Sequence, residues 1–105
     1  MSVVKINAIE VPPGMGGALE ERFAARAGEV EKMEGFEEFQ LLRPVEGESR
    51  YFVYTRWESE DAFQAWVNSE QFGKGHAQAS RPHGGPIATG SSLLGFEVVQ
   101  RVARP

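Results

Sequence analysis

Four segments of the chain place their apolar residues as β-strands do. Residues 3–11 read VVKINAIEV, rich in β-branched side chains, and end at Pro12-Pro13-Gly14, where a backbone ladder cannot continue. Residues 36–43 and 50–57 read FEEFQLLR and RYFVYTRW, and the short polar turn between them predicts a hairpin. Residues 91–102 carry apolar positions on both faces, which indicates a fourth strand.

Two further segments repeat their apolar residues every three or four positions, as helices do. The first helix is expected from Gly16 to about Met33, with Gly35 suited to a left-handed C-terminal cap. The second is expected from Glu60 to about Glu70, because Ser59 can cap its first turn. The order strand, helix, strand, strand, helix, strand predicts an α+β protein with the ferredoxin-like βαββαβ arrangement.

Two helices on one face of a four-stranded antiparallel sheet would leave the other face bare. The bare face would carry Ile9, Val11, Leu93 and Val99, or the alternate set, depending on which face the helices cover. An apolar sheet face of this size exceeds the patch that a soluble monomer usually exposes. We therefore predict that the face packs against a second copy of the chain in a homodimer.

Composition narrows the class of protein. The 105 residues correspond to a single domain over 1–105. The chain has no cysteine, which excludes disulfides, thiol catalysis and cysteine-ligated metals. The net charge of −4 argues against nucleic acid as a partner. Its apolar runs are too short to span a membrane, and the first residues lack a signal-peptide pattern, so we expect a soluble cytoplasmic protein.

Few residues qualify for chemistry. The chain has two histidines, His76 and His83, both in the glycine-rich connection after the second helix; their spacing suggests zinc only weakly. Trp66 lies on the apolar stripe of the second helix, where it is either a core residue or a pocket residue. Asn7 is unusual within a strand. It is either buried and hydrogen-bonded, or it faces a cavity and offers its amide to a ligand.

The segment AFQAWVNSEQFGKGH, residues 62–76, resembles the second-helix signature of the IsdG-type haem-degrading monooxygenases. These enzymes belong to the antibiotic biosynthesis monooxygenase superfamily, and the resemblance is closest to their mycobacterial branch. The family carries an Asn on the first strand, a Trp on the second helix and a His about ten residues later. Asn7, Trp66 and His76 stand in those places, and the similarity extends over nearly the whole chain.

The resemblance implies a homodimeric α+β barrel in which each chain binds haem as both cofactor and substrate. Dioxygen and an external electron donor would open the porphyrin ring and release iron. His76 would be the axial haem iron ligand. Asn7 would offer a hydrogen-bond donor to the reacting oxygen, and Trp66 would press the porphyrin out of plane. The expected pocket walls, each also suited to the core, are Phe23, Phe63, Phe72, Ile9 and Val53. Arg26 would meet a propionate, or else lie on a solvated helix face.

The sequence departs from the family just before the ligand. Gly73-Lys74-Gly75 stands where relatives have helix-favouring residues, and each helical glycine costs about 1 kcal/mol. We therefore expect a looser His76 segment, with His83 as the substitute ligand if the segment shifts. Three other functions stay open: a cofactor-free monooxygenase of the same superfamily acting on a phenolic or polyketide-like substrate, a haem-binding or buffering protein without turnover, and a structural dimer.

Overall fold

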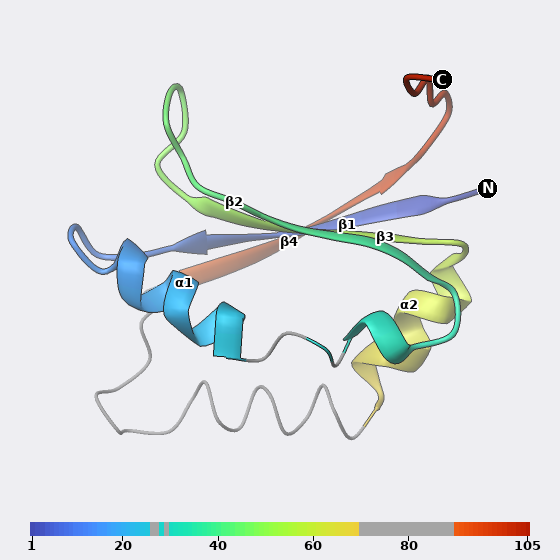
Figure 1. The fold of residues 1–105 in the computed structure, drawn as a ribbon, viewed down its shortest axis with the longest axis horizontal. Coiled ribbons are helices and arrows are strands. Elements are labelled where there is room, and N and C mark those ends of the chain that lie inside the picture. The colour runs from blue at the N-terminus through green and yellow to red at the C-terminus, as the bar shows by residue number, and fades with distance from the viewer. Residues whose placement is uncertain (26–27, 29, 70–89) are drawn as a thin grey trace.

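A computed structural model describes residues 1–25, 28, 30–69 and 90–105 of the chain. The elements, drawn in Figure 1, are β1 (Val3–Glu10), α1 (Gly16–Ala25), the 3₁₀ turn η1 (Val30–Lys32), β2 (Phe36–Leu42), β3 (Tyr51–Trp57), α2 (Glu60–Val67) and β4 (Gly90–Glu97). The strands form one antiparallel sheet in the order β2-β3-β1-β4. The predicted ferredoxin-like arrangement is confirmed. No helix among the described residues is long and apolar enough to cross a membrane.

The registers of β1 explain where the last strand ends. Val3 of β1 pairs with Trp57 of β3 on one side and with Glu97 of β4 on the other. One further hydrogen bond, from the Val98 N–H to the Ser2 carbonyl at 2.9 Å, follows the ladder. The predicted strand over 91–102 was therefore too long, because β1 begins at Val3 and offers no partner to residues beyond Val98.

The first helix is shorter than its periodicity predicts. α1 ends at Ala25, and Gly28 has φ +102°, a left-handed conformation that an α-helix cannot contain. The expected helix to Met33 was therefore wrong, and residues 30–32 form only a 3₁₀ turn. Val30 and Met33 nonetheless pack against the core, which accounts for the helical spacing of their apolar side chains.

The start of the second helix is confirmed. Ser59 is the N-cap of α2, and its hydroxyl accepts a hydrogen bond from the Ala62 N–H at 3.2 Å. Gly35, with φ +84°, lies directly against this helix, and its carbonyl accepts the Glu58 N–H at 2.8 Å. A Cβ at Gly35 would approach the Ala62 Cβ to 2.5 Å, so a side chain at this position would push α2 away from the sheet.

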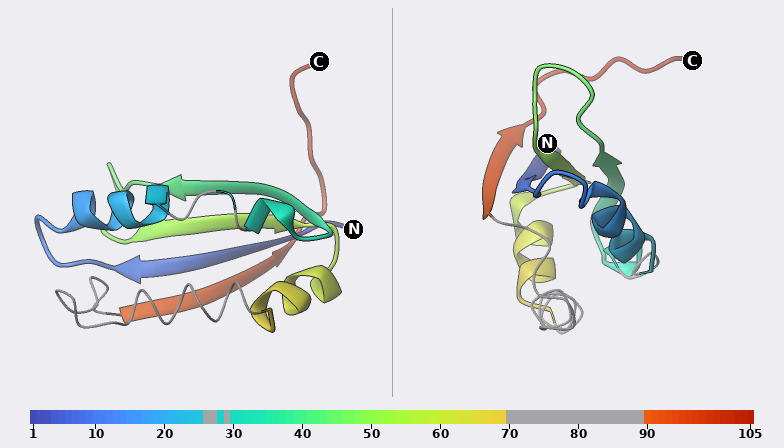
Figure 2. Two further views of the ribbon diagram at one scale, coloured as in Figure 1. Left: turned by 60° about the horizontal axis from the view of Figure 1, so that its bottom comes forward. Right: turned by 90° about the vertical axis from the view of Figure 1, so that its left-hand side faces the viewer.

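Both helices cover the same face of the sheet, as Figures 1 and 2 show. The core on this face is divided into two clusters of buried residues. Ile9, Leu19 and Tyr51 lie at the α1 end, and Val3, Trp57 and Phe63 lie at the α2 end. Trp57 is fully buried, and its indole N–H has no hydrogen-bond partner among the described residues, at a cost of about 1–3 kcal/mol.

The opposite face of the sheet carries the alternate residues, among them Val4, Ile6, Leu94 and Phe96. Phe96 is 51% exposed, and Leu42, at the end of β2, is 40% exposed. Of the two apolar sets predicted for the bare face, the helices cover the one that contains Ile9. The structure thereby leaves the set with Val4 and Ile6 open.

Candidate functional site

A polar strip separates the two core clusters on the helix-covered face. Strand alternation directs Val3, Lys5, Asn7 and Ile9 of β1 toward the helices. The two ends of this row belong to the buried clusters, whereas its centre is the polar pair Lys5 and Asn7. Opposite them on β3 stand Thr55 and Val53. The centre of the covered face is therefore suited to a ligand rather than to continuous apolar packing.

Asn7 is half-buried at the middle of β1, where its neighbours are Val53 on β3 and Leu93 on β4. Within the described residues its side-chain amide makes no hydrogen bond. A half-buried amide normally finds partners. Of the two interpretations that the sequence left open, this geometry favours the amide that is available to a ligand.

Trp66 lies in the last turn of α2 and is half-buried. Its ring stacks on Trp57, with centroids 6.5 Å apart and planes 28° from parallel. Trp57 in turn meets Phe36 and Phe63 edge to face, at 5.5 Å and 6.1 Å. Trp66 is thus neither a fully buried core residue nor a loose surface residue, because its indole rests on the fully buried ring of Trp57.

Lys5 joins the strand that carries Asn7 to the helix that carries Trp66. Its Nζ lies 2.7 Å from Glu60 Oε1 in the first turn of α2 and 4.9 Å from the centroid of the Phe63 ring. The Lys5 side chain is only 15% exposed. Its hydrogen bond, together with a weaker contribution from Gln64, lowers the pKa of Glu60 and keeps that carboxylate ionised.

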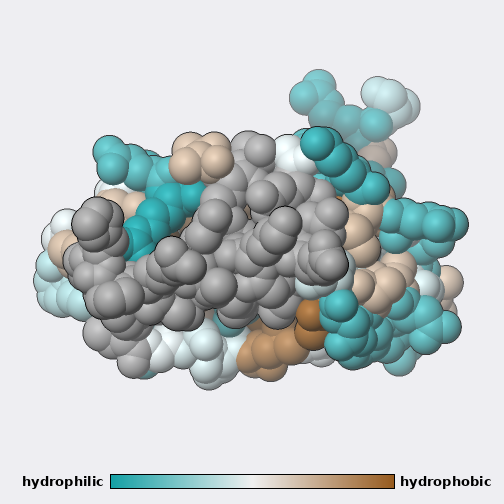
Figure 3. Space-filling view, turned by 90° about the horizontal axis from the view of Figure 1, so that it is seen from below, coloured by the Kyte–Doolittle hydropathy of each residue, from teal (hydrophilic) through white to brown (hydrophobic). Residues whose placement is uncertain are grey.

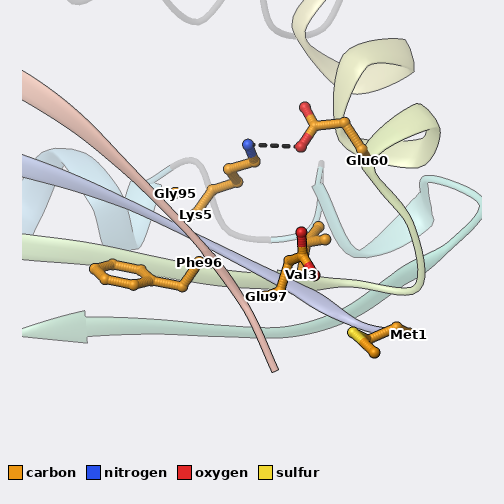
Figure 4. A pocket seen from close by; sticks show the side chains of 7 residues that line it. All are labelled: Met1, Val3, Lys5, Glu60, Gly95, Phe96 and Glu97. Carbon is orange, nitrogen blue, oxygen red and sulfur yellow. Dashed lines mark ion pairs between the residues drawn. The ribbon is translucent and has the colours of Figure 1, made fainter. Parts of the chain in front are cut away.

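Lys5 and Glu60 also line an open groove of about 700 Å³ between α2 and β4, shown in Figure 4. The other lining residues are Met1, Val3, Gly95, Phe96 and Glu97. Figure 3 shows the helix side of the molecule, where strongly hydrophobic residues gather at one edge, beside hydrophilic ones. Sequence reasoning missed Lys5, although its position two residues before Asn7 places both on one face of the strand.

A second polar cluster holds α1 against the sheet. The Tyr51 hydroxyl donates to Glu20 Oε2 at 2.5 Å, and the Arg43 guanidinium donates to both carboxylate oxygens of Glu20. The bond from Arg43, followed by that from Tyr51, lowers the pKa of Glu20 from 4.5 to about 2. The same carboxylate raises the pKa of Tyr51. α1 is thereby bound to the end of β2 and the start of β3.

The residues predicted to form the pocket walls differ in how deeply they are buried. Ile9 and Phe63 belong to the two buried clusters, at 6% and 7% exposure. Phe23 and Val53 are half-buried against the Ile9 cluster, and the Phe23 ring centre lies 6.2 Å from that of Phe39. The other predicted site residues lie outside the described residues; they are Arg26, Phe72, His76 and the substitute ligand His83. The segment before the ligand, which we expected to be looser, also lies outside the described residues.

The fold and the family comparison agree on the class of protein. Residues 2–78 match the antibiotic biosynthesis monooxygenase family, and the chain belongs to this family. A curated relative is the mycobilin-producing heme oxygenase of Mycobacterium tuberculosis strain H37Rv. It is 61% identical over 99 residues, which cover 94% of this chain and 90% of the relative.

Two solved structures extend the comparison. The heme-degrader MhuD of Mycobacterium tuberculosis, with two hemes bound in its active site, has a TM-score of 0.81 and 58% identity. That alignment covers 96% of this chain and 99% of the other. A mutant of SnoaB, a cofactor-independent oxygenase from Streptomyces nogalater, has a TM-score of 0.75 and 25% identity, with 98% of both chains covered.

Proposed function

We propose that this protein is a haem-degrading monooxygenase, which binds haem as substrate and cofactor and opens its porphyrin ring. The observation that carries the proposal is the 61% identity to the mycobilin-producing heme oxygenase over 94% of the chain. Dioxygen and an external electron donor are the co-substrates that we propose, because ring opening by a monooxygenase consumes both. Iron is released when the ring no longer surrounds it.

The described residues fit a flat, apolar ligand that has one polar side. Trp66 offers a half-buried indole, and Phe23 and Val53 offer half-buried apolar surface. The Asn7 amide supplies an unused donor between the two core clusters. Bound haem would supply the redox-active iron at which dioxygen reacts with the ring.

The chain's own residues would bind and orient the substrate. We propose that His76 ligates the haem iron, because a neutral imidazole is a common axial ligand. Asn7 donates a hydrogen bond toward the reacting oxygen and thereby orients it. Trp66 presses against the macrocycle from the second helix, and Phe72 completes the apolar wall. Arg26 pairs with a propionate of the substrate.

We further propose that two copies associate through the open sheet face to form an α+β barrel. Val4, Ile6, Leu94 and Phe96 lie on this face, and about half of the surface of Phe96 is exposed. Contiguous apolar surface of this kind marks an interaction site. A second copy presents the same residues, so a two-fold arrangement would bury both sheets against each other.

The decisive experiment is a titration of the purified protein with hemin, followed at the Soret band. A saturable shift at one or two hemins per chain is expected, and no shift would refute the proposed function. Ascorbate is then added under air with catalase present. Loss of the Soret band and appearance of ring-opened tetrapyrrole establish degradation, whereas an intact Soret band would indicate a haem-buffering protein.

A second candidate is a cofactor-free monooxygenase that acts on a phenolic or polyketide-like substrate. The observation that favours it is the similarity to SnoaB, described as a cofactor-independent oxygenase. The test is oxygen consumption by the haem-free protein in the presence of a polycyclic phenol. Consumption in this assay, without a Soret response to hemin, would make the second candidate the better one.

A further inference from the structure

Trp57 lies directly behind Trp66, on the side where the indole meets the protein interior. Trp57 ends β3 and is held by the sheet from both sides, since it pairs with Val3 of β1 and with Phe36 of β2. It is 0% exposed, and the rings of Phe36 and Phe63 meet its edges. Dense packing of this kind holds the Trp57 side chain in place.

Trp66 lies near the end of a short helix. α2 has only eight residues, and Trp66 occupies its last turn, two residues before the C-cap Asn68. Packing against its ring restricts the rotamers that a half-buried side chain can adopt. The stack on Trp57, with centroids 6.5 Å apart and planes 28° from parallel, is a packing contact of this kind.

An indole at position 57 carries a penalty that a phenyl ring would avoid. The Trp57 N–H is buried without a hydrogen-bond partner in the part of the chain that the structure describes. A phenylalanine has no N–H to desolvate, but it presents a smaller face to Trp66. The feature that distinguishes tryptophan here is therefore the extent of its ring face.

We propose that Trp57 is a positioning residue that fixes the orientation of Trp66. This inference rests on the proposed function, in which Trp66 presses on the macrocycle. Bending a macrocycle requires a support that does not yield. The buried cluster around Trp57 provides the support, so the position of the Trp66 ring is set by the core.

The test compares Trp57→Phe with Phe36→Leu. Both variants remove part of the same aromatic cluster, but only Trp57→Phe removes the ring on which Trp66 stacks. The haem-free proteins are labelled with 5-fluorotryptophan, and the Trp66 ¹⁹F resonance is assigned with Trp66→Phe. We expect this resonance to move toward the position of free 5-fluorotryptophan in Trp57→Phe and to stay in place in Phe36→Leu. No movement in Trp57→Phe, or the same movement in both variants, would overturn the proposal.

Hemin-loaded protein provides the second readout. Trp57→Phe is expected to bind hemin but to lose intensity in the out-of-plane porphyrin modes of its resonance Raman spectrum. Its ring opening is expected to slow about tenfold, since a misplaced contact group weakens catalysis. Unchanged Raman modes in Trp57→Phe would overturn the proposal. If wild type binds no hemin, the proposed function fails while the ¹⁹F measurement still decides the positioning role.

A measurement on wild type covers the case in which Trp57→Phe does not fold. Nuclear Overhauser effects between ring protons of Trp57 and Trp66 are expected in solution, because the stacked rings lie in contact. Their absence would show that the stack does not persist, and would refute the positioning role without any variant.

Discussion

Lys5 Nζ lies 2.7 Å from Glu60 Oε1 and so connects β1 to the first turn of α2. The same ammonium lies 4.9 Å from the Phe63 ring centroid, one turn along the helix. Asn7 follows Lys5 on the same face of the strand, and Trp66 follows Glu60 on the helix. This ion pair therefore connects β1, which carries Asn7, to α2, which carries Trp66. The separation of these two elements sets the distance between the two proposed site residues.

Lys5→Met is expected to lower the free energy of unfolding by about 1 kcal/mol, because it removes a partly exposed ion pair and a cation–π contact. Arg50→Met is the matched control, since Arg50 pairs with Glu48 and lies over Phe52 in the hairpin, away from Asn7 and Trp66. Urea unfolding followed by circular dichroism should give similar losses for both. Only Lys5→Met should weaken hemin binding. An equal effect of both variants on hemin affinity would contradict the role of Lys5 in setting the site.

Glu20 makes part of the stability of the fold depend on pH. Its pKa is about 2 in the folded protein against an ordinary 4.5, because Arg43 and Tyr51 hydrogen-bond the carboxylate. A lowered pKa means that the unfolded state binds a proton more readily. The stabilisation is therefore complete above about pH 4.5 and is lost as the pH falls toward 2.

Glu20→Gln tests this dependence directly. The variant should unfold at lower urea concentration than wild type at about pH 6, and the difference should shrink as the pH falls from about 4.5 to about 2.5. Glu21→Gln, an exposed neighbour in the same helix, serves as the control and should track wild type throughout. A difference that stays constant with pH would show that Glu20 acts by packing rather than by its charge.

Asn7→Ala is expected to slow haem degradation while leaving hemin bound, because the amide contributes a donor rather than the main binding surface. Asn7→Asp separates the donor from the shape of the side chain, since it keeps the size and removes the NH₂ group. Both variants should show a wild-type Soret titration and slower loss of the Soret band with ascorbate. Undiminished turnover in both would remove Asn7 from the mechanism.

His76→Ala is expected to abolish ligation of the haem iron and to leave the far-ultraviolet circular dichroism unchanged. The spectrum of its hemin complex should lose the features of an imidazole-ligated iron, and free imidazole should restore them. If the spectrum of the variant matches wild type, the ligand lies elsewhere. His83→Ala is then the next variant to measure.

The proposed dimer predicts a mass near twice 11.6 kDa by sedimentation equilibrium at micromolar concentration. Ile6 lies at the centre of the open face, between Tyr54 and Leu94, so Ile6→Glu should produce a folded monomer. Val45→Glu adds the same charge at a hairpin residue that is 89% exposed, and it should remain dimeric. Wild type that sediments as a monomer would contradict the dimer outright.

Local sequence was sufficient for the elements and for part of their boundaries. β-branched runs identified β1 and β3, Ser59 identified the start of α2, and Pro44 identified the end of β2, because each acts through its own backbone. The ends of α1 and β4 depended on other parts of the chain. The helical spacing of apolar residues extends to Val30 and Met33, although Gly28 between them and α1 has a left-handed conformation. β4 ends at Glu97, which pairs with Val3 at the start of β1.

The sequence by itself determined the order of the elements, the alternation of residues on each strand, and the identity of Asn7 and Trp66 as candidates. Only the tertiary structure decided which sheet face the helices cover, since both faces of β1 are apolar enough to pack. It also decided that Lys5 and Asn7 separate two core clusters, and that Trp66 rests on Trp57. These relations join residues far apart along the chain, and their energies arise only when the strands and helices have packed together.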